Sequence, residues 1–109
     1  MLDMMDHEMQ ICLVELVGTL AFVYFLNNNK TGPAWMGGVA LAVIIFVAKM
    51  VVPHAKAHLN PAVTIGLASI HNNVLDVLMK PKNIKCILAQ VVGGVLAVSM
   101  PPTTMFALN

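Results

Sequence analysis

The apolar residues of this chain fall into three long runs, separated by polar or proline-containing breaks. The long runs are Ile11–Leu26, Ala34–Val52 and Ile84–Met100. A helix crosses the hydrocarbon of a bilayer with about 17–25 residues. The pattern therefore predicts three transmembrane helices over about 10–26, 34–52 and 84–100.

A fourth apolar run, Pro61–Ile70, is shorter. At about 1.5 Å per residue, a helix of this length reaches only halfway across the hydrocarbon. Asn60 is a favourable N-cap, and Pro61 suits the first helical turn, where its missing N–H costs nothing. We therefore predict a re-entrant half-helix over about 61–71, followed by a polar linker from His71 to Asn83.

The composition agrees with a bilayer as the solvent. Of the 109 residues, 59% are hydrophobic and 10% are charged, whereas soluble domains carry about 25% charged residues. We expect an all-α membrane protein with one domain over residues 1–109, made of the three transmembrane helices and the half-helix. The net charge of +1 argues against a nucleic-acid-binding protein.

The basic residues predict the orientation. All six are lysines, and no arginine is present. A cytoplasmic N-terminus leaves only Lys30 outside and places five on the inside, as the positive-inside rule requires: Lys49, Lys56, Lys80, Lys82 and Lys85. Because the chain starts with acidic residues, no secretory signal is indicated, and we expect a multi-pass protein that retains its first span.

A half-helix that starts inside the membrane places unpaired N–H groups and a positive dipole end there. Such backbone is tolerated only where it is buried in protein or lines a wet cavity. With the amide of Asn60 at its tip, this element is suited to repel cations and to form hydrogen bonds with a neutral solute.

Three short motifs carry a resemblance to a known family. They read Glu-Leu-Val-Gly-Thr at 15–19, Asn-Pro-Ala-Val-Thr at 60–64 after His58, and Ala-Gln-Val-Val-Gly at 89–93. In this order and at these separations, they resemble the N-terminal half of the aquaporin, or major intrinsic protein, family. The resemblance implies a passive channel for water or small neutral solutes such as glycerol, and no enzyme activity and no cofactor.

The resemblance also implies roles for individual residues. Asn60 would donate its amide to the passing solute, while Pro61 and Ala62 would set the start of the half-helix against its counterpart. Glu15 and Gln90 would brace the loop that leads to Asn60. The carbonyl groups that would line the single-file path belong to Ala57, His58 and Leu59.

The chain also departs from the family pattern. The family has six spans and two Asn-Pro-Ala half-helices, so we interpret this chain as one half, with a second half or further subunits as expected partners. The filter arginine of the family has no counterpart, and Lys56 stands at a glycine position of the loop. In the family, a residue of the second span contributes to the narrow selectivity filter of the pore. That position falls at Val43 here, or near Ala40 by counting back from Asn60. Neither residue is aromatic, which favours a wider filter.

Two other interpretations remain open. The chain is also compatible with a truncated, non-conducting relative that associates with other subunits. An unrelated metal carrier is the third hypothesis, because soft ligands gather near the start and His54 and His58 lie four residues apart; these ligands are Met1, Met4, Met5, His7, Met9 and Cys12. We favour the channel, with no metal site, and expect Cys12 and Cys86 to be buried thiols.

Overall fold

The computed structural model describes residues 5–70 and 73–102 of the chain. Within these ranges it contains helices and no strand, so the all-helical fold class is confirmed. The helices are α1 (His7–Asn28), α2 (Trp35–Val51), α3 (Pro61–Ala68), α4 (Val74–Leu78) and α5 (Pro81–Ser99). Two of them, α1 and α5, are long and apolar enough to cross a membrane, judged by length and composition, whereas α2 is a shorter apolar helix of 17 residues.

Side-chain caps explain why α1 is longer than its apolar run. The carboxylate of Asp6 accepts a hydrogen bond from the backbone N–H of Met9 at 2.7 Å, which stabilises the first turn. At the other end, the amide groups of Asn28 and Asn29 donate to the carbonyl groups of Tyr24 and Phe25. These polar residues extend the helix past both ends of the predicted span.

The linker predicted from His71 to Asn83 is wrong in part, because it contains a helix and the start of another. The side chain of Asn73 accepts from the N–H of Leu75 at 2.9 Å and caps the short helix α4. Pro81 begins α5 instead of breaking the chain, since the first helical position needs no N–H. His71 and Asn72 themselves lie outside the described residues.

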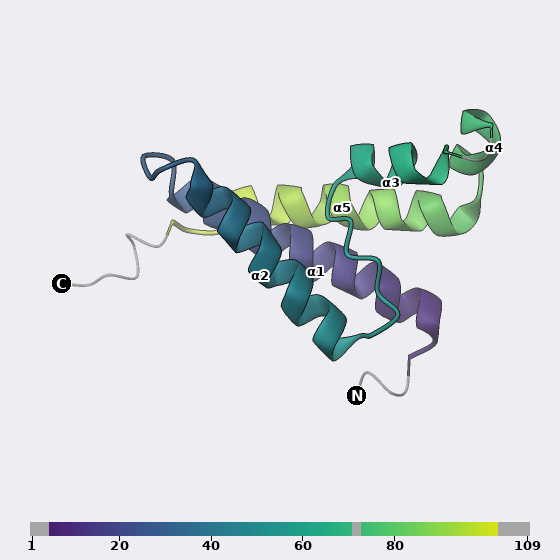
Figure 1. Ribbon diagram of the computed structural model, residues 1–109, viewed down its shortest axis with the longest axis horizontal. Coiled ribbons are helices and arrows are strands. Elements are labelled where there is room, and N and C mark those ends of the chain that lie inside the picture. The colour runs from purple at the N-terminus through teal and green to yellow at the C-terminus, as the bar shows by residue number, and fades with distance from the viewer. Residues whose placement is uncertain (1–4, 71–72, 103–109) are drawn as a thin grey trace.

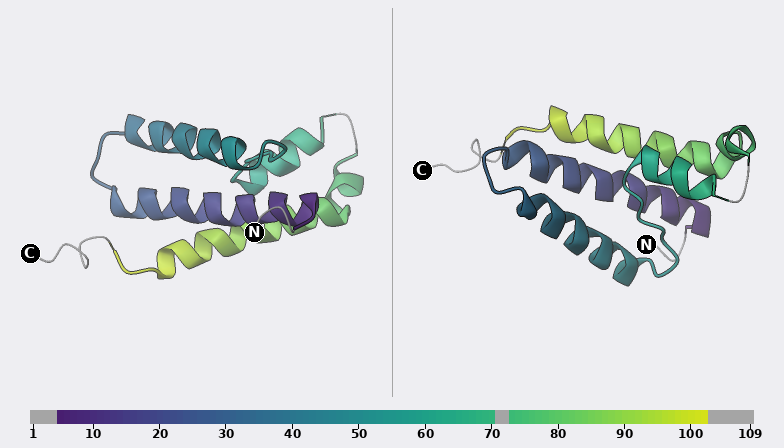
Figure 2. Two further views of the ribbon diagram at one scale, coloured as in Figure 1. Left: turned by 90° about the horizontal axis from the view of Figure 1, so that it is seen from below. Right: turned by 45° about the horizontal axis from the view of Figure 1, so that its top comes forward.

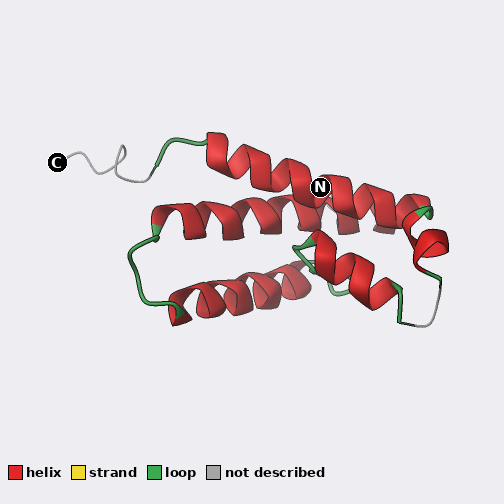
Figure 3. Ribbon diagram, turned by 90° about the horizontal axis from the view of Figure 1, so that it is seen from above, coloured by secondary structure: helices red, strands yellow, loops and turns green. Residues whose placement is uncertain are grey.

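Helices α1 and α5 pack against each other, and α2 lies along the opposite side of α1 (Figures 1 and 2). The segment 52–60 leaves the end of α2 and runs back toward the middle of the long axis. There α3 begins, and it returns along α5 to the end of the molecule from which the segment came (Figure 2). Viewed from above, α2 and α3 follow one another along one side of the molecule (Figure 3).

Glycines allow α1 to approach its neighbours closely. A Cβ atom at Gly93 of α5 would collide with the backbone carbonyl oxygen of Leu16. A Cβ atom at Gly18 of α1 would lie 2.6 Å from the Cδ2 atom of Leu59. Because Ala97 is also fully buried, the face of α5 toward α1 is built from small residues, as in close helix pairs within membranes.

The distribution of polarity is the reverse of that in a water-soluble protein. Glu15 and Gln90 are each only 1% exposed, and they are among the largest fully buried side chains of the described residues. By contrast, α2 contains no buried residue, and its Phe46 and Met50 are 66% and 67% exposed. Soluble monomers rarely expose contiguous apolar surface on this scale.

Candidate functional site

The start of α3 is formed by Asn60 and Pro61. The Oδ1 atom of Asn60 accepts a hydrogen bond from the N–H of Ala62 at 2.8 Å, and Pro61 occupies the first turn. The side chain of Asn60 is exposed. Because its oxygen caps the helix, its NH2 group is the end that is left to donate to a solute.

The segment that leads to Asn60 has an unusual backbone. Ala57 and Leu59 adopt positive φ angles of 51° and 57°, although neither is a glycine. Both side chains are buried, at 3% and 4% exposed. A left-handed conformation costs an L-residue about 1–2 kcal/mol, so the surrounding contacts must hold this segment in place. The left-handed backbone falls on these two residues and not on Lys56, where the sequence departs from the expected glycine.

Glu15 of α1 provides those contacts. Its Oε2 atom accepts from the N–H of His58 at 3.0 Å, and its Oε1 atom accepts from the N–H of Leu59 at 2.8 Å. The Nε2 atom of Gln90, on α5, donates to the same Oε1 atom at 2.8 Å. A buried carboxylate with three donors is well satisfied, and the two N–H groups belong to a segment that has no helix to satisfy them.

Thr64 joins α3 to the same group. Its hydroxyl accepts from Nε2 of Gln90 at 2.8 Å, lies 3.1 Å from Nδ1 of His58, and lies 3.4 Å from the carbonyl oxygen of Asn60, to which it donates. Gln90 is therefore linked to α3 by its hydrogen bond to Thr64, and to the segment 52–60 by its hydrogen bond to Glu15. We call Glu15, His58, Thr64 and Gln90 the polar cluster.

Thr64 was missed as a site residue, although it lies within the 60–64 motif. The available signal was its position four residues after Asn60, which returns its side chain to the same face of the half-helix. A single hydroxyl in an apolar run gave no indication of its partners on other elements.

Three members of the polar cluster, Glu15, His58 and Thr64, border a cavity of about 190 Å³. Lys56, Lys82 and Asn83 also line it. Burial lowers the pKa of His58, which lies in the segment 52–60, while the charge of Glu15 opposes this shift. The neutral imidazole is thereby favoured, and a neutral ring can both donate and accept at its two nitrogen atoms.

Val43 lies apart from this cluster. It is 54% exposed on α2 and lines an apolar groove of about 400 Å³ with Leu13, Val17 and Val47. Neither Asn60 nor any member of the polar cluster lines this groove. The structure therefore gathers Glu15, Ala57, His58, Leu59, Asn60 and Gln90 around one segment, and it does not bring the expected filter residue to them.

The histidines and cysteines considered for metal binding do not converge on one point among the described residues. The ring of His54 stacks on that of His7, with centroids 4.0 Å apart, so it is directed to α1. Within residues 5–70 and 73–102, no group of three or more His, Cys, Asp or Glu side chains is placed to hold a metal ion. Met1 and Met4 lie outside the described residues, and Cys12 and Cys86 are free, half-buried thiols.

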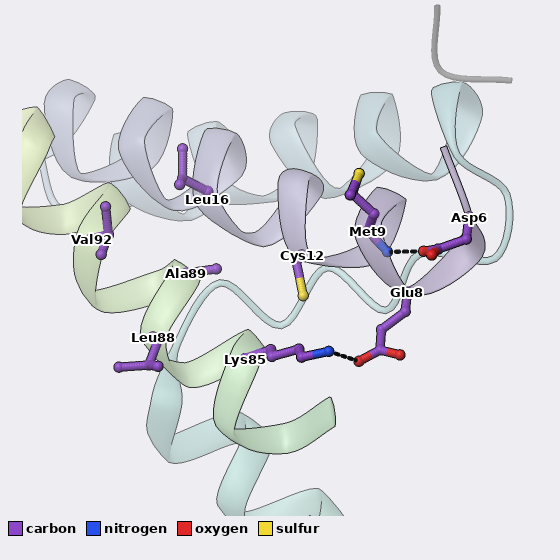
Figure 4. A pocket seen from close by; sticks show the side chains of 9 residues that line it. All are labelled: Asp6, Glu8, Met9, Cys12, Leu16, Lys85, Leu88, Ala89 and Val92. Carbon is purple, nitrogen blue, oxygen red and sulfur yellow. Dashed lines mark hydrogen bonds and ion pairs between the residues drawn. The ribbon is translucent and has the colours of Figure 1, made fainter. Parts of the chain in front are cut away.

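A second opening, of about 470 Å³, lies between α1 and α5 (Figure 4). The Glu8 carboxylate and the Lys85 ammonium face each other across it at 2.8 Å, and Cys12 points toward α5. Both charged side chains are about half exposed. Such an exposed pair adds little to stability. Glu8 also borders the cavity of about 190 Å³, so the pair with Lys85 neutralises a negative charge there.

No protein-family model, no curated protein and no solved structure matches the chain. The site itself and the three motifs are therefore the basis on which a function is proposed.

Proposed function

We propose that the chain is a multi-pass membrane protein that supplies one half of a passive channel for water or small neutral solutes. In this proposal α1, α2 and α5 cross the bilayer, and α3 is the re-entrant half-helix. The N-terminus is cytoplasmic, in accordance with the distribution of the lysines. The three motifs found in the sequence support the same assignment by their resemblance to aquaporins.

The observation that carries the proposal is the position of Asn60. It caps the start of α3 near the middle of the long axis, and the segment before it is tied down by Glu15 (Figure 1). A helix that begins inside the membrane presents its positive end to whatever passes. A polar helix start is tolerated at such a depth only where it is buried in protein or lines a wet cavity, and the exposed side chain of Asn60 favours the wet cavity.

The reversed polarity of the surface supports the membrane location. Exposed apolar side chains cover α2, whereas the polar side chains of Glu15, Thr64 and Gln90 are buried between α1, α3 and α5. In lipid, polar side chains pair with each other inside a helix bundle, as Glu15 and Thr64 do here with the Nε2 amide group of Gln90.

In the proposed mechanism, solute moves down its gradient in single file. It exchanges hydrogen bonds with water for hydrogen bonds with the amide of Asn60 and with the carbonyl groups of Ala57, His58 and Leu59. The positive end of α3 raises the energy of a cation or a hydrated proton at the same place. No covalent chemistry is involved, so no catalytic residue is assigned.

One chain provides one wall of such a path. Asn60 is exposed, and no side chain of α2 is buried, so the surface around the start of α3 is open. A second set of helices is required to enclose the solute. The competing proposal, a non-conducting subunit, predicts that partner helices cover Asn60 and exclude water from it.

Reactivity at residue 60 separates these two functions. We would place a single cysteine by Asn60→Cys in a Cys12→Ser, Cys86→Ser background, and treat proteoliposomes with a charged thiol reagent. The channel proposal expects rapid labelling at position 60 and little at the matched lipid-facing variant Val95→Cys, which is 58% exposed in the structure. Equal protection of both positions would overturn it.

Osmotic shrinkage of the same liposomes tests the half-channel part of the proposal. We expect the chain alone to shrink at the rate of empty liposomes, because it lacks a second wall. Faster shrinkage that Asn60→Asp alters would show that copies of this chain complete the pore, which contradicts the half-channel proposal while retaining the role of Asn60.

A further inference from the structure

Two lysines from separate elements meet at one cavity. Lys56 comes from the segment 52–60, and Lys82 comes from the first turn of α5; both side chains are exposed. The deep side of the same cavity of about 190 Å³ is formed by the buried Glu15 and Thr64. The cavity is thus a polar recess with two positive charges at its mouth.

The carboxylates that border the recess are already engaged. Glu8 forms its ion pair with Lys85 at 2.8 Å. Glu15 accepts from two backbone N–H groups and from Gln90. Within residues 5–70 and 73–102, neither Lys56 nor Lys82 has a carboxylate within 4.0 Å, so their charges are left without a protein counterion.

The same end of the molecule carries further positive charge. Lys49 is near the end of α2, and Lys80 precedes α5; both are exposed. In the membrane orientation proposed above, this end lies at the cytoplasmic surface of the bilayer. Exposed apolar residues continue from it along α2, beginning with Met50 and Val51.

We propose that the recess between Lys56 and Lys82 binds the phosphate of an anionic phospholipid head group. Two ammonium groups without counterions attract a phosphate oxygen each, and His58 and Asn83 add polar groups at the wall. Basic recesses between helices at the cytoplasmic side are suited to anionic head groups, and the surface of α2 offers an apolar path for an acyl chain. The proposal depends on the proposed membrane location, but not on conduction through Asn60.

Lipid retention tests the proposal on the full chain. The chain would be reconstituted in nanodiscs of equal parts phosphatidylglycerol and phosphatidylcholine, and released for native mass spectrometry. We compare the double variant Lys56→Gln, Lys82→Gln with Lys49→Gln, Lys80→Gln, which removes the same charge from the same end but outside the recess. We expect phosphatidylglycerol retention to fall about tenfold in the first variant and to change little in the second.

Equal losses in the two double variants, or no loss in either, would overturn the proposal, since they indicate diffuse surface charge or no binding. A competition arm identifies the source of the phosphate: millimolar glycerol phosphate should not displace the lipid. Displacement at low concentration would instead indicate a soluble phosphate ligand. Protection of Val95→Cys from the charged thiol reagent is read in parallel, so that loss of membrane insertion, which would expose this position, is distinguished from loss of the lipid site.

Discussion

Two buried threonines illustrate how differently the same residue type is used in this chain. Thr64 is 3% exposed and its hydroxyl has partners on Gln90, His58 and Asn60. Thr19 is 5% exposed, and among the described residues its hydroxyl has no hydrogen-bond partner. A buried polar group stabilises a fold only when it is paired.

The variant Thr64→Val should therefore lower the free energy of unfolding by about 1–3 kcal/mol, because it leaves the amide of Gln90 and the ring of His58 short of a partner. Thr19→Val is the matched control. It has the same shape and burial, and we expect it to be neutral or stabilising. Unfolding in mixed detergent micelles measures both, and equal losses would contradict the role given to Thr64.

The left-handed backbone at Ala57 leads to a second prediction. A β-branched residue resists this conformation, so Ala57→Val should be less stable than Ala55→Val by about 1–2 kcal/mol. Both alanines are buried, at 3% and 5% exposed, but only Ala57 has a positive φ. The difference between the two unfolding free energies removes the shared effect of added volume. A difference of zero would indicate that the segment does not take this conformation.

At the scale of elements, the contact between α1 and α5 determines where the polar cluster forms. Glu15 and Gln90 come from these two helices and meet only because small residues let the backbones approach. Gly93 is the closest point of this contact. The hydrogen bond between Gln90 and Glu15 therefore requires a glycine at position 93, one turn away from Gln90.

Gly93→Ala should destabilise the fold by about 1–3 kcal/mol, since its Cβ would meet the backbone of α1, which cannot move as a side chain can. Gly38→Ala provides the control on α2, where a Cβ would have no atom within 4 Å. There the helix propensity of alanine should add stability, by up to about 1 kcal/mol. Thermal unfolding of the two variants should move in opposite directions.

Much of the helix content could be predicted from the apolar pattern, because apolar runs of this length indicate helices. The cap at Asn60 was predicted for the same reason, since an Asn-Pro pair before an apolar run has a local meaning. Helix α4 was missed because its five residues carry no periodic pattern, and only the cap at Asn73 indicates it. The partners of Thr64 and the positive φ angles at Ala57 and Leu59 depend on contacts between distant elements, which no local pattern contains.

At the scale of the whole molecule, the path of the chain between α2 and α5 determines where the polar helix start lies. The segment 52–60 and α3 enter and leave at the same end, with the turning point at the start of α3, which Asn60 caps (Figure 1). The five lysines near this end are explained if it is cytoplasmic. The apolar outer surface is explained if the helices lie in a bilayer.

The most direct test is the depth of residue 60 in a bilayer. A nitroxide attached to Asn60→Cys, in the background without the native cysteines, would be measured by power saturation with oxygen and with a polar nickel complex. The account predicts a label near the bilayer centre that the nickel complex still reaches, whereas a label at Val95→Cys is reached by oxygen alone. A label at position 60 that lies at the membrane surface, or at the centre without access to the nickel complex, would contradict the central claim that α3 places Asn60 on an aqueous path inside the membrane.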